Sequence, residues 1–328
     1  MNIDRTNTKS IRSAYGKMLV ELGKTNQDIV VLDADLASST QTILFGKEFP
    51  ERFFDMGIAE QDMITTAAGL ASQGKIPFAS TFAMFATGRT YDQIRNSIAY
   101  PKFNVKIVAT HGGITVGEDG ASHQALEDIA LMRNIPNMTV IAPADCKECE
   151  EVIKYAAEYQ GPVYIRIPRT NVPDIFDESY KFNLKGKIIR EGGDVTIVTN
   201  GETLAEVIEC ANILEKSGIE AKIIHLPVVK PLDNDIILKE AQKIGEGIKL
   251  FVTVENHSII GGLGSAVCEV LSENIPTLVH RIGINDEFGQ SGEQRELMEF
   301  YELTAEKLAQ KIKALVEKTE RNELEKIG

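Results

Sequence analysis

Two of the chain's five histidines lie in a single glycine-rich, acidic loop, THGGITVGEDGASHQ, at residues 110–124. His111 and His123 enclose four glycines together with Glu118 and Asp119. Imidazole nitrogens can donate hydrogen bonds to hydroxyl, carbonyl or phosphate oxygens, and they exchange protons near neutral pH. The loop is therefore compatible with a metal site, a phosphate-binding loop or a substrate pocket, and the rest of the sequence must decide among them.

Two further segments carry side chains that could take part in chemistry. Glu60 lies in FFDMGIAEQDM at the start of a predicted helix, where an acidic residue is ordinarily favoured by the helix dipole. The apolar segment before it suggests a partly buried carboxylate instead. Phe82 and Phe85, in STFAMF, are three residues apart. Core packing is the usual role of such a pair, and a platform for a flat ring is the alternative.

Cys146 and Cys149 form a CxxC motif at the start of another predicted helix, so that both thiols share one helical face. A zinc site usually needs a second pair of ligands, and none is suitably spaced nearby. A redox or metal role is therefore disfavoured, and four cysteines in 328 residues do not form a disulfide framework. We expect this chain to supply no metal site of its own.

The composition is that of an average globular protein, with 43% hydrophobic and 25% charged residues, and the length favours two domains. The balance of 35 basic against 48 acidic residues gives a net charge of −13, which argues against nucleic-acid and anionic-membrane surfaces. The N-terminus lacks the apolar core of a signal peptide, and no apolar run approaches the roughly 20 residues of a membrane span. We therefore expect a cytoplasmic protein that binds neither nucleic acid nor membrane.

Apolar, β-branched runs alternate with helical patterns through the first half of the chain, which predicts a mostly parallel sheet with helices on both faces. The predicted strands are 29–36, 77–81, 104–110, 138–144 and 162–168. The predicted helices are 9–24, 60–73, 88–99, 124–134 and 147–158. Open α/β sheets bind ligands beyond the carboxyl ends of their strands. Five segments are therefore expected to converge on one site: DADLASS, DMGIAEQ, STFAMF, the loop 110–124 and PRTN.

The pattern pauses at 170–190, a polar stretch predicted to be a linker, and then restarts. We therefore expect an α/β protein of two domains, 1–178 and 188–328, each a mostly parallel sheet flanked by helices. Strands of the second domain are predicted at 194–200, 220–226, 249–256 and 277–283, and a terminal helix at 304–318.

Two helix starts in the second domain carry more specific expectations. A capping box at Thr203–Glu206 is predicted to open a helix that stops at Gly218. The glycine-rich turn ENHSIIGGLGSAV, residues 255–267, leads from a strand into a helix. It would either bind an anion at the helix N-terminus or, as we favour, let the chain pack closely against a partner subunit. We assign no catalytic residue there.

Several of these segments together resemble transketolase: GIAEQDM, STFAMF followed by TYDQIR, the ATHGGITVGEDGASHQ loop and the IPNMTVIAPAD run. The resemblance is to the C-terminal portion of that enzyme, meaning its pyrimidine-binding domain and small third domain, and it covers nearly the whole chain in order. It implies a thiamine-diphosphate-dependent enzyme of the pentose phosphate pathway type, which transfers a two-carbon ketol unit between sugar phosphates.

The resemblance also assigns the cofactor contacts. Glu60 matches the glutamate that hydrogen-bonds the aminopyrimidine ring and so activates the cofactor. Phe82 and Phe85 match the aromatic pocket around that ring. A third aromatic residue, present one turn later in many relatives, is Gly88 in this chain, which implies a looser pocket or one filled by Tyr91.

The substrate contacts follow in the same way. His111 and His123 match the histidines that line the substrate channel, and Asp119 matches the aspartate that binds a sugar hydroxyl. Gly112 departs from the family pattern, since most transketolases carry Asp there, and it leaves room for an unusual sugar. The residues that match the phosphate contacts at the channel mouth are Arg12, Ser39 and Arg169. Arginine suits a phosphate because its planar group makes two charge-assisted hydrogen bonds, although surface salt bridges and a helix cap remain the ordinary alternative.

One absence is informative in the light of the resemblance. Related enzymes hold the diphosphate and Mg²⁺ with a Gly-Asp-Gly motif followed by Asn, and no GDG occurs in this chain. The resemblance therefore implies one subunit of a split transketolase. Its partner, an N-terminal diphosphate-binding subunit, would supply most Mg²⁺ ligands, and the two chains would form an α2β2 assembly.

Three rival functions share the fold. The β subunit of a 2-oxo acid dehydrogenase would not need Arg12, Arg169 and His111 as a phosphate and hydroxyl set. 1-Deoxy-xylulose-5-phosphate synthase normally has RAG where this chain has THG. A non-catalytic regulatory subunit is the third rival, and the retained glutamate and histidines weigh against it. The sequence does not name the donor or the acceptor sugar.

Overall fold

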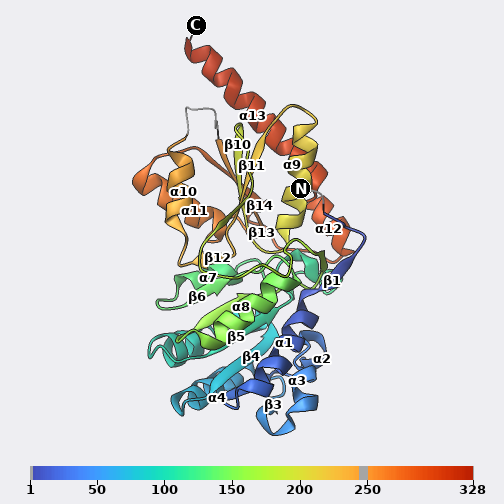
Figure 1. Cartoon of the computed structure of the whole chain (residues 1–328), viewed down its shortest axis with the longest axis vertical. Coiled ribbons are helices and arrows are strands. Elements are labelled where there is room, and N and C mark those ends of the chain that lie inside the picture. The colour runs from blue at the N-terminus through green and yellow to red at the C-terminus, as the bar shows by residue number, and fades with distance from the viewer. Residues whose placement is uncertain (1–2, 244–249, 328) are drawn as a thin grey trace.

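The predicted strands of the first half assemble side by side in one seven-stranded sheet of the computed structural model, which describes residues 3–243 and 250–327 (Figure 1). The order across the sheet is β12-β6-β7-β5-β4-β2-β3, and every neighbouring pair is parallel except β12 with β6. Burial on both faces explains why these strands read as continuous apolar runs. The strands are β2 (Ile29–Asp33), β3 (Phe53–Asp55), β4 (Ile76–Phe82), β5 (Lys106–Thr110), β6 (Thr139–Ile141), β7 (Val163–Arg166) and β12 (Val228–Lys230).

Helices cover both faces of this sheet, as predicted. One apolar core joins the sheet to α1 (Ile11–Thr25), α3 (Ile43–Glu48) and α8 (Cys146–Glu158). A second core on the opposite face holds the other helices of this half. They are α4 (Glu60–Ser72), α5 (Ala83–Thr87), the π-helical turn η2 (Ile94–Ala99) and α7 (Asp128–Asn134). Short helical turns fill the connections: α2 (Ala37–Thr40), η1 (Pro50–Arg52), α6 (Tyr91–Gln93) and η3 (Ile114–Val116).

The second half forms a five-stranded sheet in the order β14-β13-β10-β11-β9, parallel except for β9. It occupies the upper, yellow-to-red part of Figure 1. Its strands are β9 (Lys187–Arg190), β10 (Val195–Thr199), β11 (Ala221–His225), β13 (Leu250–Ser258) and β14 (Val279–Ile284). Its helices are α9 (Thr203–Glu215), α10 (Asn234–Ala241), α11 (Leu263–Asn274), α12 (Gln294–Phe300) and α13 (Ala305–Ile327). Helices α9 and α13 share one core, and α10 and α11 pack on the other.

Two features tie the halves together in ways that the sequence pattern did not predict. After β11 the chain returns to the first sheet, where Val228 of β12 pairs antiparallel with Ile141 of β6. The predicted linker also contains a strand, β8 (Asn171–Pro173), which pairs with β1 (Thr8–Ser10). The boundary between domains 1–178 and 188–328 therefore stays a prediction, because β12 crosses it.

The predicted capping box at the start of α9 is wrong. Thr203 is already helical, and its hydroxyl donates to the carbonyl of Asn200. The carboxylate of Glu206 accepts from the N–H of Ala305 at 2.8 Å and from Arg295 at 3.0 Å. The Glu206 side chain, which the local pattern assigned to the helix cap, is thus bonded to residues that are distant in the sequence.

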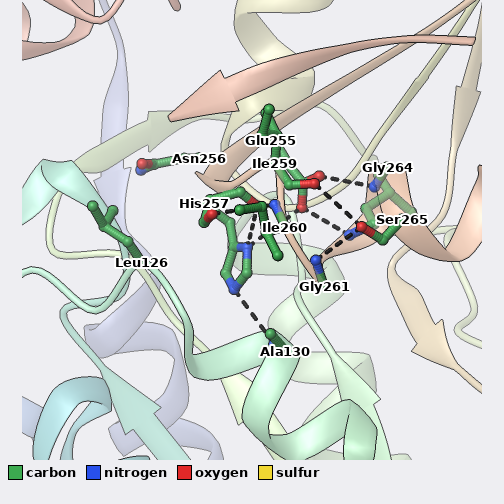
Figure 2. A network of polar contacts seen from close by, with 12 residues as sticks. Leu126, Ala130, Glu255, Asn256, His257, Ile259, Ile260, Gly261, Gly264 and Ser265 are labelled. Carbon is green, nitrogen blue, oxygen red and sulfur yellow. Dashed lines mark hydrogen bonds and ion pairs between the residues drawn. The ribbon is translucent and has the colours of Figure 1, made fainter. Parts of the chain in front are cut away.

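The glycine-rich turn does lead from β13 into α11, and Figure 2 shows what lies at the helix N-terminus. The buried carboxylate of Glu255 accepts from the N–H groups of Leu263 at 2.7 Å and of Gly264 at 2.8 Å. A Cβ at Gly262 would collide with the same carboxylate. The chain's own acid therefore fills the place that the anion hypothesis gave to a ligand, and packing of this turn against a partner subunit stays a prediction.

Candidate functional site

The five segments expected to converge do lie along one edge of the first sheet. Strands β7, β5, β4, β2 and β3 are parallel neighbours in that order, so the loops that follow them leave from the same side. The chain moves from β2 to β3 on one side and then to β4 on the other. This change of direction beside β2 creates the crevice in which open α/β sheets usually hold ligands.

An aromatic cluster sits at this edge. The ring of Phe82 stacks on that of His111, with 3.7 Å between centroids, and lies nearly parallel to that of Phe85 at 5.9 Å. His123 meets Phe85 edge-on at 5.3 Å. Both histidines of the glycine-rich loop thus join both phenylalanines of STFAMF. The rings of Phe85, His111 and His123 each contact the ring of Phe82. The arrangement offers a stacking surface with imidazole nitrogens at its margin.

Glu60 extends the cluster through a residue that the sequence analysis did not identify. Its carboxylate is only 3% exposed and accepts a hydrogen bond from Nη1 of Arg89 at 2.7 Å. The guanidinium of Arg89 also lies 4.5 Å from the centre of the Phe85 ring, a cation–π contact. Arg89 follows Phe85 by four residues, a spacing at which two side chains can meet on one face of a helix. This spacing is the sequence signal for the contact between Arg89 and Phe85.

His111 is the more buried of the two loop histidines. It is buried, its φ of 61° lies in the left-handed region, and its Nδ1 is 2.8 Å from the hydroxyl of Thr110. Burial, together with the positive charges of Arg12 and Arg169, lowers the pKa of His111 to about 3. The imidazole is therefore neutral at physiological pH. A non-glycine residue held at positive φ costs conformational energy, and such positions gather at functional sites.

The three predicted phosphate contacts lie together beside this cluster. Arg12 donates from Nη1 to the carbonyl of Ser39 at 2.8 Å and from Nη2 to the carbonyl of Arg169 at 3.2 Å. Nη1 of Arg169 donates to the carboxylate of Glu118 at 2.9 Å and to the carbonyl of Val116. Burial and the nearby Arg169 lower the pKa of Arg12. Two guanidinium groups at one spot make a local positive site in an acidic chain.

The surroundings of Arg169 leave space for a ligand. A surface pocket of about 490 Å³ opens beside this side chain, between it and residues of the second half such as Glu206 and Arg295, whereas Arg12 and Ser39 lie outside the pocket. Nε of Arg12 is buried and has no hydrogen-bond partner within the part of the chain that the structure describes. An unsatisfied buried donor of this kind is uncommon, and a bound anion would meet its requirement.

Asp119 stands apart from the rest of the predicted site. It is exposed, next to Glu118 near the tip of the loop. Within residues 3–243 and 250–327, no hydrogen bond or ion pair joins Asp119 to His111 or His123. The structure brings the other predicted residues together and leaves this one at the margin.

The two departures from the transketolase pattern have different structural consequences. A Cβ at Gly112 would lie 2.6 Å from Nε of Arg166, so that side chain fills the space. The space beside Gly112 is therefore occupied by this chain, and an unusual sugar stays a prediction. At Gly88 the nearest atom to such a Cβ is the carbonyl of Met84 at 3.4 Å, and Gly88 is exposed. The aromatic pocket is open on that side.

The alternative chemistries gain nothing from the structure. Burial and the nearby Asp145 raise the pKa of the Cys146 thiol to about 12, and Cys149 is buried with its pKa raised further. Neither thiol is a ready nucleophile, because thiolate is the reactive form. The described residues include no group of three or more His, Cys, Asp or Glu side chains placed to hold a metal ion. No described helix has the length and apolar character needed to span a membrane.

Comparison with known families gives this arrangement its context. The family model described as "Transketolase, pyrimidine binding domain" matches residues 7–174, and the one described as "Transketolase, C-terminal domain" matches residues 184–308. The chain belongs to the transketolase family. This family is thiamine-diphosphate-dependent, and a stacked aromatic pair beside a buried carboxylate fits the aminopyrimidine ring of that cofactor.

Relatives of similar length support the same placement. A protein of Methanocaldococcus jannaschii named as a transketolase C-terminal section is 54% identical, over 93% of this chain and 95% of its own. The 6-deoxy-6-sulfo-D-fructose transketolase subunit SqwH of a Clostridium species is 41% identical, over 95% of both chains. A solved chain described as "Split gene transketolase, inactive beta4 tetramer" is 51% identical with a TM-score of 0.85, over 94% of this chain and 98% of its own. The chain is thus similar throughout to split transketolase-family subunits.

Proposed function

We propose that this chain is the pyrimidine-binding subunit of a cytoplasmic, split, thiamine-diphosphate-dependent transketolase. It would transfer a two-carbon ketol unit between sugar phosphates of the pentose phosphate pathway type, once joined to a diphosphate-binding subunit in an α2β2 assembly. The observation that carries the proposal is the cluster of Phe82, Phe85, His111 and His123 beside the buried carboxylate of Glu60. These groups supply a ring platform, a hydrogen-bonding acid and two imidazoles at one sheet edge.

Glu60 is the proposed activating acid. When bound, thiamine diphosphate supplies a thiazolium carbon that carries the two-carbon unit between sugars. The carboxylate of Glu60 would accept a hydrogen bond from the protonated ring nitrogen of the aminopyrimidine, and Phe82 and Phe85 would fix the ring plane. Arg89 holds Oε1 of Glu60, which leaves the second oxygen for this bond. Arg89 would thus orient the acid and cover one side of the ring.

The loop residues are the proposed sugar contacts. His111 is neutral, so it would donate to or accept from sugar oxygens without the cost of a buried charge. His123 would act beside it, and Asp119 would close on a sugar hydroxyl from the loop tip. The phosphate would meet Arg12, Ser39 and Arg169.

Glu118 would have to give way when the phosphate binds. Its side chain is 59% exposed, so its ion pair with Arg169 contributes little stability and is easily exchanged for another anion. The phosphate oxygens would then take the hydrogen bonds that this carboxylate now accepts.

The proposed site also needs ligands for Mg²⁺, and a second chain would supply most of them. Mg²⁺ demands near-octahedral oxygen ligands, and the proposed partner would bring most of them. The 51%-identical solved chain is described as an inactive β4 tetramer, and several relatives are described as subunits or sections. We therefore propose that the lone chain self-associates without activity and that the partner completes the site.

The experiment compares this chain, a partner subunit that carries Gly-Asp-Gly, and their mixture. Titration calorimetry should show weak or no thiamine diphosphate binding by this chain alone, and Mg²⁺-dependent binding by the mixture. Ketol transfer from a ketose phosphate to an aldose phosphate should appear only in the mixture. Tight Mg²⁺-dependent binding by the lone chain would contradict the split-enzyme proposal. Decarboxylation of a 2-oxo acid in place of ketol transfer would favour a rival enzyme.

A matched variant tests the role of Glu60 in the same mixture. Glu60→Gln keeps the side-chain shape but removes the charge, so it should lower turnover by orders of magnitude while the fold stays intact. Proton–deuterium exchange at the thiazolium carbon is the direct readout. Exchange at the wild-type rate in Glu60→Gln would remove Glu60 from the activation step.

A further inference from the structure

Asn256, at the end of β13 in the C-terminal sheet, reaches directly into the loop that carries the two site histidines. Its Oδ1 accepts from the N–H of Ile114 at 3.0 Å, and its Nδ2 donates to Glu202 at 2.6 Å. Its backbone carbonyl accepts from Arg166 at 2.7 Å. Asn256 is 2% exposed, so each of these bonds is shielded from water. Figure 2 places it on its strand beside the Glu255 network.

The fit of this amide against the loop is close. Gly113 has φ 73°, and a Cβ there would lie 2.5 Å from Cγ and Oδ1 of Asn256. Gly113 is two residues after His111, and Ile114 is the next residue along. The amide therefore packs on the backbone that sets the path of the loop immediately after its first histidine.

The other end of the loop is held by the same half of the molecule. Gln124, next to His123, donates from Nε2 to the carbonyl of Gln290 at 2.9 Å. The carbonyl of Leu126 accepts from the N–H of Ser258 at 2.8 Å. Residues of the C-terminal half thus contact the loop near both histidines, although the cluster itself is built entirely from the N-terminal half.

We propose that Asn256 is a positioning residue for His111. The C-terminal half would then serve the active site by holding the glycine-rich loop 110–124 in place. The amide satisfies the Ile114 N–H, and Glu202 fixes the amide's orientation. Without Asn256 the buried Ile114 N–H loses its partner, and the Glu202 oxygen is left with its 3.9 Å ion pair to Arg166. The backbone that follows the strained His111 also loses a packing contact at Gly113. The effect of Asn256 on sugar binding rests on the proposed function, whereas its effect on the loop does not.

The first measurement is independent of activity. Hydrogen–deuterium exchange on the full chain should show the Ile114 amide exchanging about tenfold faster or more in Asn256→Ala than in wild type, since a buried bond worth 1–3 kcal/mol is gone. Tyr180→Phe is the matched control: it removes a buried hydrogen bond to Glu148, and neither residue contacts the loop. The control should leave loop exchange at the wild-type rate.

A charge-preserving swap adds a rescue. Asn256→Asp alone places a second carboxylate against that of Glu202, where a 2.6 Å hydrogen bond now joins the two side chains. The loop amides should therefore exchange with deuterium faster than in wild type. Adding Glu202→Gln restores the pair with donor and acceptor exchanged and keeps the local net charge, so the double variant should recover. A structural defect unrelated to this pair would not be repaired by the second substitution.

The second measurement uses the complex with the partner subunit. Asn256→Ala should raise KM for the ketose phosphate about tenfold while thiamine diphosphate affinity changes less than about twofold, because Phe82, Phe85 and Glu60 are untouched. The inference is overturned if Asn256→Ala keeps wild-type loop exchange and KM, or if Tyr180→Phe changes both equally. If the wild-type complex transfers no ketol unit but loop exchange still responds, the proposed function fails and the loop anchor stands.

Discussion

Arg169 shows at the scale of one residue how a site can be prepared for an anion. Its guanidinium is one-third exposed, beside the 490 Å³ pocket, and its present partners are the carbonyl of Val116 and the exposed carboxylate of Glu118. A phosphate that replaced Glu118 would find Arg12 close by, since Nη2 of Arg12 donates to the carbonyl of Arg169 at 3.2 Å. We therefore propose that the two arginines act together as a phosphate clamp.

Arg169→Ala should therefore weaken the binding of phosphorylated substrates selectively. We expect KM in the complex to rise for sugar phosphates by the equivalent of about 1.5–3 kcal/mol, the usual value of a charge-assisted hydrogen bond, and to change little for unphosphorylated analogues. Steady-state kinetics with both substrate types gives the comparison. Arg95→Ala, on an exposed arginine that donates a hydrogen bond to Asn96, is the control and should change neither. Equal losses on both substrate types would place Arg169 outside the clamp.

The sequence grouped Phe82 and His111 because each lies at the end of a buried, predicted strand, and parallel strand ends meet at one edge. Glu60 follows β3, a short and partly exposed strand that the pattern did not predict. Arg89 and Asn256 could not be. Arg89 acts through a carboxylate 29 positions earlier in the chain, and Asn256 through a loop 142 positions earlier, so their roles depend on tertiary contacts that no local pattern records.

At the scale of elements, the strands were predicted best, to within a few residues, because double-sided burial leaves an unbroken apolar run. The helix predicted at 88–99 was wrong in form. The chain there forms a turn, the short α6 and the π-helical η2, a kind of irregularity that often marks functional sites. The helix predicted at 124–134 begins only at Asp128, because the preceding residues belong to the anchored loop.

Two glycines in these elements make a matched pair of tests. Gly112→Ala should destabilise the chain by about 1–3 kcal/mol, because its Cβ would overlap Arg166, which is paired with buried Asp128 at 2.9 Å. Gly88→Ala should be neutral or stabilise by up to about 1 kcal/mol, since Gly88 caps α5 with right-handed helical dihedral angles and its added Cβ would meet nothing closer than the Met84 carbonyl at 3.4 Å. Urea unfolding of both variants measures the difference. Equal stabilities would show that Arg166 moves aside at no cost.

At the scale of the whole molecule, the two halves meet through buried polar groups as well as through β12. Glu148 of α8 accepts from Tyr180 of the linker at 2.5 Å, and its other oxygen lies 2.8 Å from Nε2 of His225 on β11. All three side chains are buried. The linker predicted at 170–190 is bonded to the first half through Tyr180 and to the second half through the Gly186 N–H, which donates to Asp233 at 2.9 Å. The sequence could not show this, because the polar composition of the linker alone reads as solvent-exposed.

This joint should make the stability of the chain sensitive to acid. Burial by itself would raise the pKa of Glu148, but the charge of His225 and the hydrogen bonds from His225, Tyr180 and the Ala144 N–H outweigh it and hold that pKa below its usual value. A carboxyl whose pKa is depressed on folding contributes stability that is fully present above its unfolded pKa of about 4.5 and is lost as pH falls through the lower folded pKa.

Glu148→Gln removes this titration, so its unfolding free energy should decline less between pH 6 and pH 3 than that of wild type, even though the variant is less stable at pH 6 because a buried charged hydrogen bond is gone. Urea unfolding across that range gives both curves. Glu178→Gln is the control, because its side chain is 95% exposed, and it should follow the wild-type curve. Parallel curves for wild type and Glu148→Gln would show that the joint between the halves keeps its strength when the carboxyl takes up a proton.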